Sequence, residues 1–255
     1  MYRIRKRIKQ SNLLVISESL EAIGAAFCSI LQHRAALETY LITHAYFESA
    51  LDPIAIDTNA PRIVQLAAAA AEIAEVGPMA ALPGSLAQLA LEAMLSTRST
   101  TSVVENGGEI AAASISKLTV GIYAGRSAFS GRVGFLLSPF DFPIGIATSS
   151  ATVGHALSFG EADAAVIVAD TASIADAVAT AVCNAVRGND YEASIQKGLE
   201  RAERTGHMRG VLIVRGNYVG MVGKLPQLVK IKANAEEIHK VGLLDAARPD
   251  VIVLT

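Results

Sequence analysis

Residues 144–182 read IGIATSSATVGHALSFGEADAAVIVADTASIADAVATAV, and three patterns follow one another in this stretch. Residues 144–148 and 163–169 are short apolar runs, which are typical of buried strands. Residues 171–187 are rich in alanine and end at Gly188, a pattern that predicts a helix with a glycine stop. The order predicts two neighbouring strands, a hydroxyl-rich loop between them and a closely packed helix after them.

The rest of the chain carries blocks of strands and blocks of helices on both sides of this stretch. Apolar residues at helical spacing predict helices at 19–48 (with a break near 32–35), 61–76, 83–96 and 190–205. Period-two patterns predict strands at 2–8, 12–17, 100–105, 109–115, 117–123 and 132–138, and a hairpin around Gly216-Asn217. Gly107-Gly108, Gly125 and Gly131 mark turns among the later strands. Blocks with tight turns favour an α+β fold with mixed or antiparallel sheets over a doubly wound parallel sheet. Because no flexible linker divides the chain, we expect one domain, residues 1–255, of two closely packed lobes.

The composition narrows the class of protein. The chain has 255 residues, of which 51% are hydrophobic and 18% charged, so it can bury a large core. Its formal net charge of −2 gives no electrostatic footprint for nucleic acid. Five basic residues among the first ten alternate with apolar ones, which predicts an edge strand with a solvated basic face.

Two further features bear on the compartment. No stretch has the length and apolarity of a membrane span or of a secretory signal, so we expect no membrane partner. Cys28 and Cys183 lie in separate apolar helical stretches, and we expect both to be buried, reduced thiols. These features predict a cytoplasmic protein, and its apolar composition together with default symmetry predicts a homodimer.

Several familiar catalytic motifs are missing from the sequence. It contains no GxSxG nucleophile elbow, no HExxH zinc motif and no GxGxxG after the first strand. The segment GMVGKL at 220–225 resembles a P-loop only superficially, since it lacks the first glycine and the Ser or Thr after the lysine.

Two segments rich in small residues remain as candidate ligand loops. Gly77-Pro78-Met79-Ala80-Ala81 separates two predicted helices, and the following helix offers free N–H groups to an anion. Glu105-Asn106-Gly107-Gly108-Glu109 separates two predicted strands, and a simple hairpin needs no acid on both sides of its turn. An ordinary turn is the competing interpretation of both segments, and from the residues alone it is the better one.

The loop inside residues 144–182 is a third candidate. Thr148, Ser149, Ser150, Thr152, His155 and Ser158 place five hydroxyls and one imidazole within eleven residues of a strand end. Hydroxyl groups bind phosphate or ring edges well, but a solvated loop has a similar composition.

The fourth candidate lies in the alanine-rich helix. Asp176 and Thr180 are spaced i and i+4, so they share one helix face and can bind a hard cation such as Mg²⁺ through oxygen. The competing interpretation is an acid favoured near a helix N-terminus and a threonine bonded to its own backbone. A buried aspartate among alanines still requires a partner, and a metal would supply one.

Taken in order, these segments resemble a known family. The matching stretches are HRAALETYLITHAYFESALDP (33–53), AEVGPMAALPG (74–84), VVENGGEI (103–110), GIYAG (121–125), GIATSSATVGHALSFGEADAAVIVA (145–169) and ADAVATAV (175–182). The chain is similar over nearly its full length to uncharacterised ApbE-related proteins of bacteria and archaea. Their wider superfamily includes the FAD:protein FMN transferases.

The resemblance implies an ApbE-like, T-fold-related architecture, a flavin-sized pocket and Mg²⁺. It implies that Asp176 and Thr180 hold the metal together with the backbone carbonyl of Ala80 or Ala81. It places the cofactor, FAD, FMN or a related ring compound, against Gly77, Pro78, Met79, Asn106, Gly107, Gly108, Thr148, Ser149 and Ser158. His155 and Ser150 are the candidates for assisting proton transfer.

Two departures from the transferase pattern leave the reaction open. Ala81-Leu82-Pro83-Gly84 replaces an AKG segment, and His155 keeps its place without the Asp and Pro of the usual HxxDPxTG motif. The sequence therefore predicts a Mg²⁺-dependent enzyme acting on FAD or a related phosphate-bearing aromatic cofactor. The alternatives are a binding protein that kept the pocket and lost the chemistry, and a structural protein with a vestigial pocket.

Overall fold

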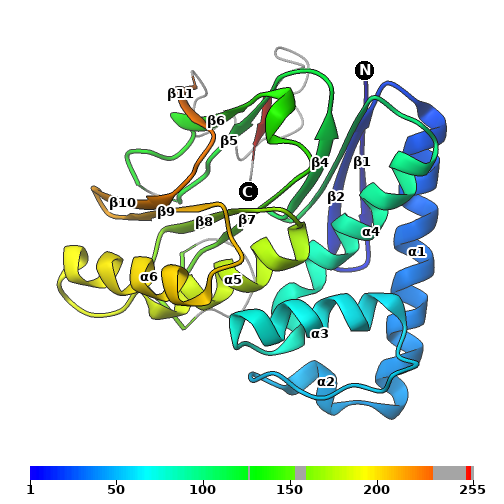
Figure 1. The fold of residues 1–255 in the computed structure, drawn as a ribbon, viewed down its shortest axis with the longest axis horizontal. Coiled ribbons are helices and arrows are strands. Elements are labelled where there is room, and N and C mark those ends of the chain that lie inside the picture. The colour runs from blue at the N-terminus through cyan, green and yellow to red at the C-terminus, as the bar shows by residue number, and fades with distance from the viewer. Residues whose placement is uncertain (126, 153–158, 232–250, 254–255) are drawn as a thin grey trace.

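An eight-stranded antiparallel sheet forms the centre of the molecule (Figure 1). The computed structural model describes residues 1–125, 127–152, 159–231 and 251–253. The strand order is β1-β2-β3-β4-β7-β8-β9-β10, with every neighbouring pair antiparallel. The strands are β1 (Tyr2–Ile8), β2 (Ser11–Ser17), β3 (Thr101–Asn106), β4 (Ile110–Ser114), β7 (Ile144–Ser149), β8 (Ala164–Ala169), β9 (Gly210–Arg215) and β10 (Tyr218–Gly223).

Helices cover one face of this sheet, and a smaller sheet covers part of the other face (Figure 1). The helices are α1 (Leu20–Thr43), α2 (Tyr46–Ser49), α3 (Arg62–Ala74), α4 (Leu82–Ser96), α5 (Ala172–Ala185) and α6 (Tyr191–Thr205), with the 3₁₀ turns η1 (Pro78–Ala81) and η2 (Pro139–Asp141). The smaller sheet has the order β11-β6-β5-β12, formed by Gln227–Lys230, Val133–Leu137, Leu118–Gly121 and Val251–Val253. The result is three layers of secondary structure, with apolar cores on both sides of the large sheet.

Strand alternation assigns residues to these two cores. In β7, Ile144 and Ile146 belong to the core between the sheets, whereas Ala147 belongs to the core under the helices. On the helix side the residues are small, which lets α5 lie close to the sheet. A Cβ on Gly145 would lie 2.2 Å from the carbonyl carbon of Thr171, so this position accepts only glycine without movement of the backbone. The alanines and glycines therefore fix the position of α5 over β7.

Most predicted elements are confirmed, as is the α+β class. The segments at 2–8, 12–17, 144–148 and 163–169 are strands, and β1 is an edge strand as expected. The predicted break near 32–35 is wrong, because α1 continues to Thr43 and the chain turns only at His44. Strands β11 and β12 were not anticipated.

The cysteine prediction is correct for one residue and wrong for the other. Cys183 is buried, but Cys28 is exposed because it lies on the outer face of α1, and neither forms a disulfide. Within the described residues, no single helix is long and apolar enough to span a membrane, although α3 and Pro78–Ser96 meet that measure as a pair bent by 105°.

Candidate functional site

The glycine turn between β3 and β4 lies against the start of α4. The backbone N–H of Asn106 donates to the carbonyl of Glu109 at 2.9 Å, which closes the turn. Gly107 and Gly108 have φ angles of 76° and 121°, a region that favours glycine. The side-chain amide of Asn106 donates to the carbonyl of Pro83 at 3.1 Å. The turn is thereby fixed to the first turn of α4.

Asp176, in the second turn of α5, also lies against the first turn of α4. Its side chain is buried, and its Oδ2 accepts the backbone N–H of Gly84 at 2.8 Å. Gly84 lies in the first turn of α4, where backbone N–H groups have no partner within the helix. Asp176 therefore has a structural role, since it accepts a free backbone N–H at the N-terminus of a neighbouring helix. This contact supplies the partner that a buried aspartate requires, and it occupies one of the two carboxylate oxygens.

A second buried carboxyl, that of Glu109, lies near Asp176. Glu109 is 8% exposed. Burial, the charge of Asp176 and the charge of Glu105 all raise the pKa of Glu109 well above its ordinary value. Burial likewise raises the pKa of Asp176 to about 8, and the Gly84 N–H opposes that shift. Three acidic side chains thus gather around this turn.

Positive charge approaches this cluster on the side of Glu105. The guanidinium of Arg5 lies 3.9 Å from Oε2 of Glu105. By contrast, no cation contributes to the pKa shifts of Glu109 or Asp176. The acidic pair next to α4 therefore lacks a compensating charge from the described residues.

The strand register divides the predicted site between the two faces of the sheet. Val104 and Ala111 belong to the core under the helices, whereas Val103 and Ile110 belong to the core between the sheets. By alternation Asn106 and Glu109 lie on the helix face, and Glu105 lies on the opposite face.

The same rule separates Thr148 from Ser149 in β7. Ser149 lies on the helix face with Ala147, and Thr148 lies on the face of the smaller sheet with Ile146. The Oγ1 of Thr148 is buried and has no hydrogen-bond partner among the described residues. The β4–β7 pairing ends at Ile110 and Ile146, so the predicted hydroxyls follow it at the end of β7 that lies towards the glycine turn.

The other predicted metal-binding positions lie near Asp176. Thr180 is half-buried, one turn further along α5. Ala80 is half-buried in η1, which packs against α5. The alternative carbonyl, that of Ala81, already accepts the hydroxyl of Ser85 at 2.6 Å. Ala80 is therefore the better candidate of the two.

Other predicted residues have structural explanations or lie outside the described residues. Gly77 is required by packing, since a Cβ there would lie 1.8 Å from the carbonyl oxygen of Ala50. Pro78 is buried at the start of η1, and Met79 packs against the core under the helices. The hydroxyl of Ser150 accepts the N–H of Thr152 at 3.1 Å. His155 and Ser158 fall within the residues that the structure does not describe.

The donor set fits a hard cation only in part. In the described ranges, no three His, Cys, Asp or Glu side chains form a group that could hold a metal. Two carboxylates, a hydroxyl and a backbone carbonyl are nevertheless oxygen donors of the kind that Mg²⁺ prefers. Mg²⁺ commonly uses one or two carboxylates together with phosphates of its substrate. The residues therefore fit an ion that binds with a phosphate-bearing ligand.

Glu109 is the residue that the sequence did not assign. An acid on each side of the glycine turn was the available signal, but the sequence alone does not say which acid faces the helices. The register assigns Glu109 to the face of Asp176.

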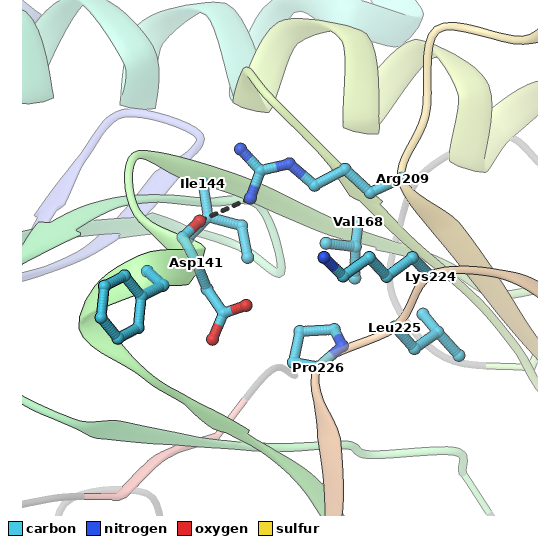
Figure 2. Close-up of a pocket in the computed structure, with 8 residues that line it drawn as sticks. Asp141, Ile144, Val168, Arg209, Lys224, Leu225 and Pro226 are labelled. Atoms are coloured by element: carbon cyan, nitrogen blue, oxygen red, sulfur yellow. Dashed lines mark hydrogen bonds between the residues drawn. The ribbon is translucent and has the colours of Figure 1, made fainter.

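A separate pocket lies at the opposite end of β7, between the two sheets (Figure 2). It measures about 140 Å³ and is lined by Phe140, Asp141, Ile144, Val168, Arg209, Lys224, Leu225 and Pro226. The guanidinium of Arg209 donates to Asp170 Oδ1 at 2.7 Å, to the carbonyl of Pro143 at 2.8 Å and to the carbonyl of Asp141. No predicted site residue lines this pocket, and Arg209 serves there to hold η2 against the sheet.

Arg209→Ala should destabilise the protein by about 2 kcal/mol, because three hydrogen bonds are lost at about 0.5–1.5 kcal/mol each. Lys224→Ala is the matched control. Lys224 lines the same pocket and is exposed, so its loss should change stability by less than about 0.5 kcal/mol. Urea unfolding measures both values, and equal effects would contradict the assigned role of Arg209.

The sequence is similar to a known protein family over most of its length. A family model described as "AbpE bacteria" matches residues 2–206. The UPF0280 protein MJ1526 of Methanocaldococcus jannaschii is 40% identical over 231 residues, which cover 90% of this chain and 93% of that protein. A UPF0280 protein of Methanothermobacter thermautotrophicus is 43% identical over 201 residues, which cover 78% of each chain.

Solved structures share the fold at low sequence identity. The ApbE protein of Thermotoga maritima is 15% identical with a TM-score of 0.52, over 86% of this chain and 96% of that chain. The apo form of the flavinyl transferase ApbE from Pseudomonas stutzeri is 13% identical with a TM-score of 0.53, over 91% and 94% of the two chains. These similarities establish the ApbE-like fold.

Proposed function

Because this chain belongs to the AbpE bacteria family, we propose that it is a Mg²⁺-dependent enzyme acting on FAD or a related phosphate-bearing aromatic cofactor. Two structures of the same fold are described as a flavinyl transferase and a flavin transferase. This proposal carries their ligand class over to the present chain, where the glycine turn and the end of β7 supply the ligand-facing backbone and hydroxyls.

The position of Asp176 is the observation that supports the proposal most. Its carboxylate is held by Gly84 N–H at 2.8 Å and lies next to a turn without side-chain bulk at Gly107 and Gly108. Asp176, Thr180 and the carbonyl of Ala80 would hold Mg²⁺. The ion would supply charge neutralisation at the phosphates of the ligand. Asn106, Gly107, Gly108 and Ser149 would orient the ligand on the helix face, and Thr148 would support the end of β7 from the other face.

Two reactions suit this site. Water can cleave the phosphoanhydride of FAD to give FMN and AMP, or an acceptor hydroxyl can take the FMN group while AMP leaves. In either case His155 would accept the proton of the attacking hydroxyl, and Ser150 would assist the transfer by hydrogen bonding. Gly77, Pro78, Met79 and Ser158 complete the proposed surroundings of the cofactor.

The test is incubation of purified protein with FAD and Mg²⁺, followed by liquid chromatography for FMN and AMP and by intact-mass analysis for covalently bound flavin. We expect AMP to form only when the divalent ion is present. AMP with free FMN identifies cleavage, and AMP with a flavin adduct identifies transfer. Absence of both binding and turnover with FAD would refute the proposal.

A non-catalytic cofactor-binding protein is the second candidate. The departures at Leu82-Pro83 and after His155 favour it, because they remove residues that the transferases carry. It predicts a flavin or related ring compound that co-purifies with the protein, tight binding and no AMP. An absorbance spectrum and mass spectrometry of ligand released from fresh protein, read beside the AMP assay, separate the two candidates.

The proposal includes a cytoplasmic homodimer in which residues 1–255 form one domain of two lobes. Light scattering coupled to size-exclusion chromatography measures the dimer directly. A mass of one chain, 26.6 kDa, at micromolar concentration would rule it out.

A further inference from the structure

Glu109 has no partner that explains its burial. It is 8% exposed, and alternation from Ala111 places its side chain on the helix face, directly before β4. Among the described residues, the only hydrogen bond to its carboxylate comes from its own backbone N–H. Its charged neighbours are Asp176 and Glu105, both acids. A buried polar group in this state calls for a ligand, an ion or a proton.

The space beside Glu109 is open. A Cβ placed on Gly107 would meet only one heavy atom within 4 Å, the Oε2 of Glu109 at 3.8 Å. Gly84, by comparison, would meet backbone of α5 at 2.3 Å. The glycine turn therefore leaves room next to the Glu109 carboxylate, at the exposed position of Gly107.

We propose that Glu109 is the second protein carboxylate of the divalent-cation site, and that the ion and a phosphate-bearing ligand bind there cooperatively. This inference rests on the proposed function for the identity of the ligand. Two acids brought together out of water repel each other, and a divalent cation between them removes that cost.

The cooperativity follows from the small number of protein oxygen atoms that can bind the ion. No group of three metal-binding side chains exists among the described residues, so two carboxylates leave most of the coordination of Mg²⁺ unfilled. Phosphate oxygens of the ligand can fill it. Without the ion, the phosphate would face two acidic side chains that offer it no positive charge. The ion should therefore increase the affinity of the protein for the phosphate-bearing ligand, and the ligand should increase the affinity for the ion by the same factor.

Mn²⁺ binding, followed by electron paramagnetic resonance without any nucleotide, tests the role of Glu109 independently of flavin. We expect Glu109→Gln to weaken Mn²⁺ binding about tenfold or more. Glu105→Gln is the matched control: it is the same change in β3, at a side chain on the opposite face of the sheet, and it should alter Mn²⁺ binding less than about twofold. Glu109→Asp keeps the charge and should retain part of the affinity, which guards against a Gln variant that does not fold.

FAD titrations by flavin fluorescence, with and without Mg²⁺, test the cooperativity. The parent protein should bind FAD about tenfold more tightly with Mg²⁺, and Glu109→Gln should lose that gain. Equal Mn²⁺ affinity of the parent and Glu109→Gln, or no Mn²⁺ binding by either, would overturn the inference whether or not FAD binds. Mn²⁺ binding that depends on Glu109 in a protein that does not bind FAD would keep the cation site, and would refute both the cooperativity with FAD and the proposed function.

Discussion

Asp176→Asn is expected to reduce Mg²⁺-dependent turnover of FAD by about 100-fold or more, and at the same time to raise the melting temperature of the ligand-free protein at about pH 8. The amide oxygen of the new side chain can still accept the N–H of Gly84, so the contact between α4 and α5 is kept. What is lost is the negative charge, which the proposed metal site needs and the fold does not. A loss of activity with a gain in stability distinguishes a functional carboxylate from a structural one.

The gain in stability follows from the pKa of Asp176. Burial raises the folded-state pKa from 3.8 to about 8. Between these values the unfolded chain has released the proton and the folded chain has retained it, so the stability of the parent falls as the pH rises from about 4 to about 8. The asparagine variant has no such proton at this position, and the charge that raises the pKa of Glu109 also disappears.

Melting temperatures measured from pH 5 to 9 in a chelating buffer check this prediction. We expect the variant to melt about 4–8 °C above the parent at the alkaline end, which corresponds to about 2 kcal/mol, and the difference to shrink towards acid pH. Asp52→Asn makes the same chemical change at an exposed position and should leave the profile unchanged. A lower melting temperature for Asp176→Asn at every pH, with normal turnover, would mean that Asp176 serves only to hold α4.

The order of strands and helices could be predicted from the sequence because most elements carry their own periodicity. Strands β1, β2, β7 and β8 are alternating or wholly apolar, and glycines mark the turns between β3 and β4 and between β9 and β10. The helical stripe through residues 32–35 was interrupted by polar residues and suggested a break. The structure shows an unbroken helix there, since α1 crosses α3 and α4 along one side and tolerates polar residues on its exposed face.

The pairing of strands and the packing of helices from distant segments could not be predicted, because the periodicity of a segment does not encode its partner. Strand β11 has only four residues, and β12 only three, so neither has enough alternation to be recognised. Likewise the exposure of Cys28 depends on which face of α1 meets α4. Ala-rich surroundings suggested burial, but on this helix they extend over the exposed side as well.

The burial of Asp176 was predictable from the sequence, and the arrangement of the residues around it was less so. A charged residue in an alanine-rich helix stands out in any sequence. The assignment of Thr148 and Ser149 to one ligand surface was incomplete, because adjacent residues of a strand point to opposite faces. Glu109 required the register of β3 with β4 and the packing of α5 before its proximity to Asp176 became visible.

Gly84→Ala is expected to destabilise the protein by about 3 kcal/mol, because α4 and α5 touch at this residue. A Cβ there would lie 2.3 Å from the carbonyl oxygen of Ala172 and 2.7 Å from Cβ of Asp176. Both contacts are with the body of a helix and not with the end of a flexible side chain, so the helices must move apart. Gly24→Ala is the control: a Cβ there meets nothing within 4 Å, and removing a glycine from the exposed face of α1 should stabilise the protein by about 0.5–1 kcal/mol.

Urea unfolding measures these opposite effects, and a Gly84→Ala variant as stable as the parent would contradict the close contact. The same variant links the fold to the site. The displacement that makes room for the methyl group also moves the Gly84 N–H away from Asp176, and the loop held by Asn106 and Pro83 must follow. FAD binding by Gly84→Ala should therefore weaken even under conditions where the variant remains folded. Small residues are needed between α4 and α5 because the backbone of one helix must reach the carboxylate of the other.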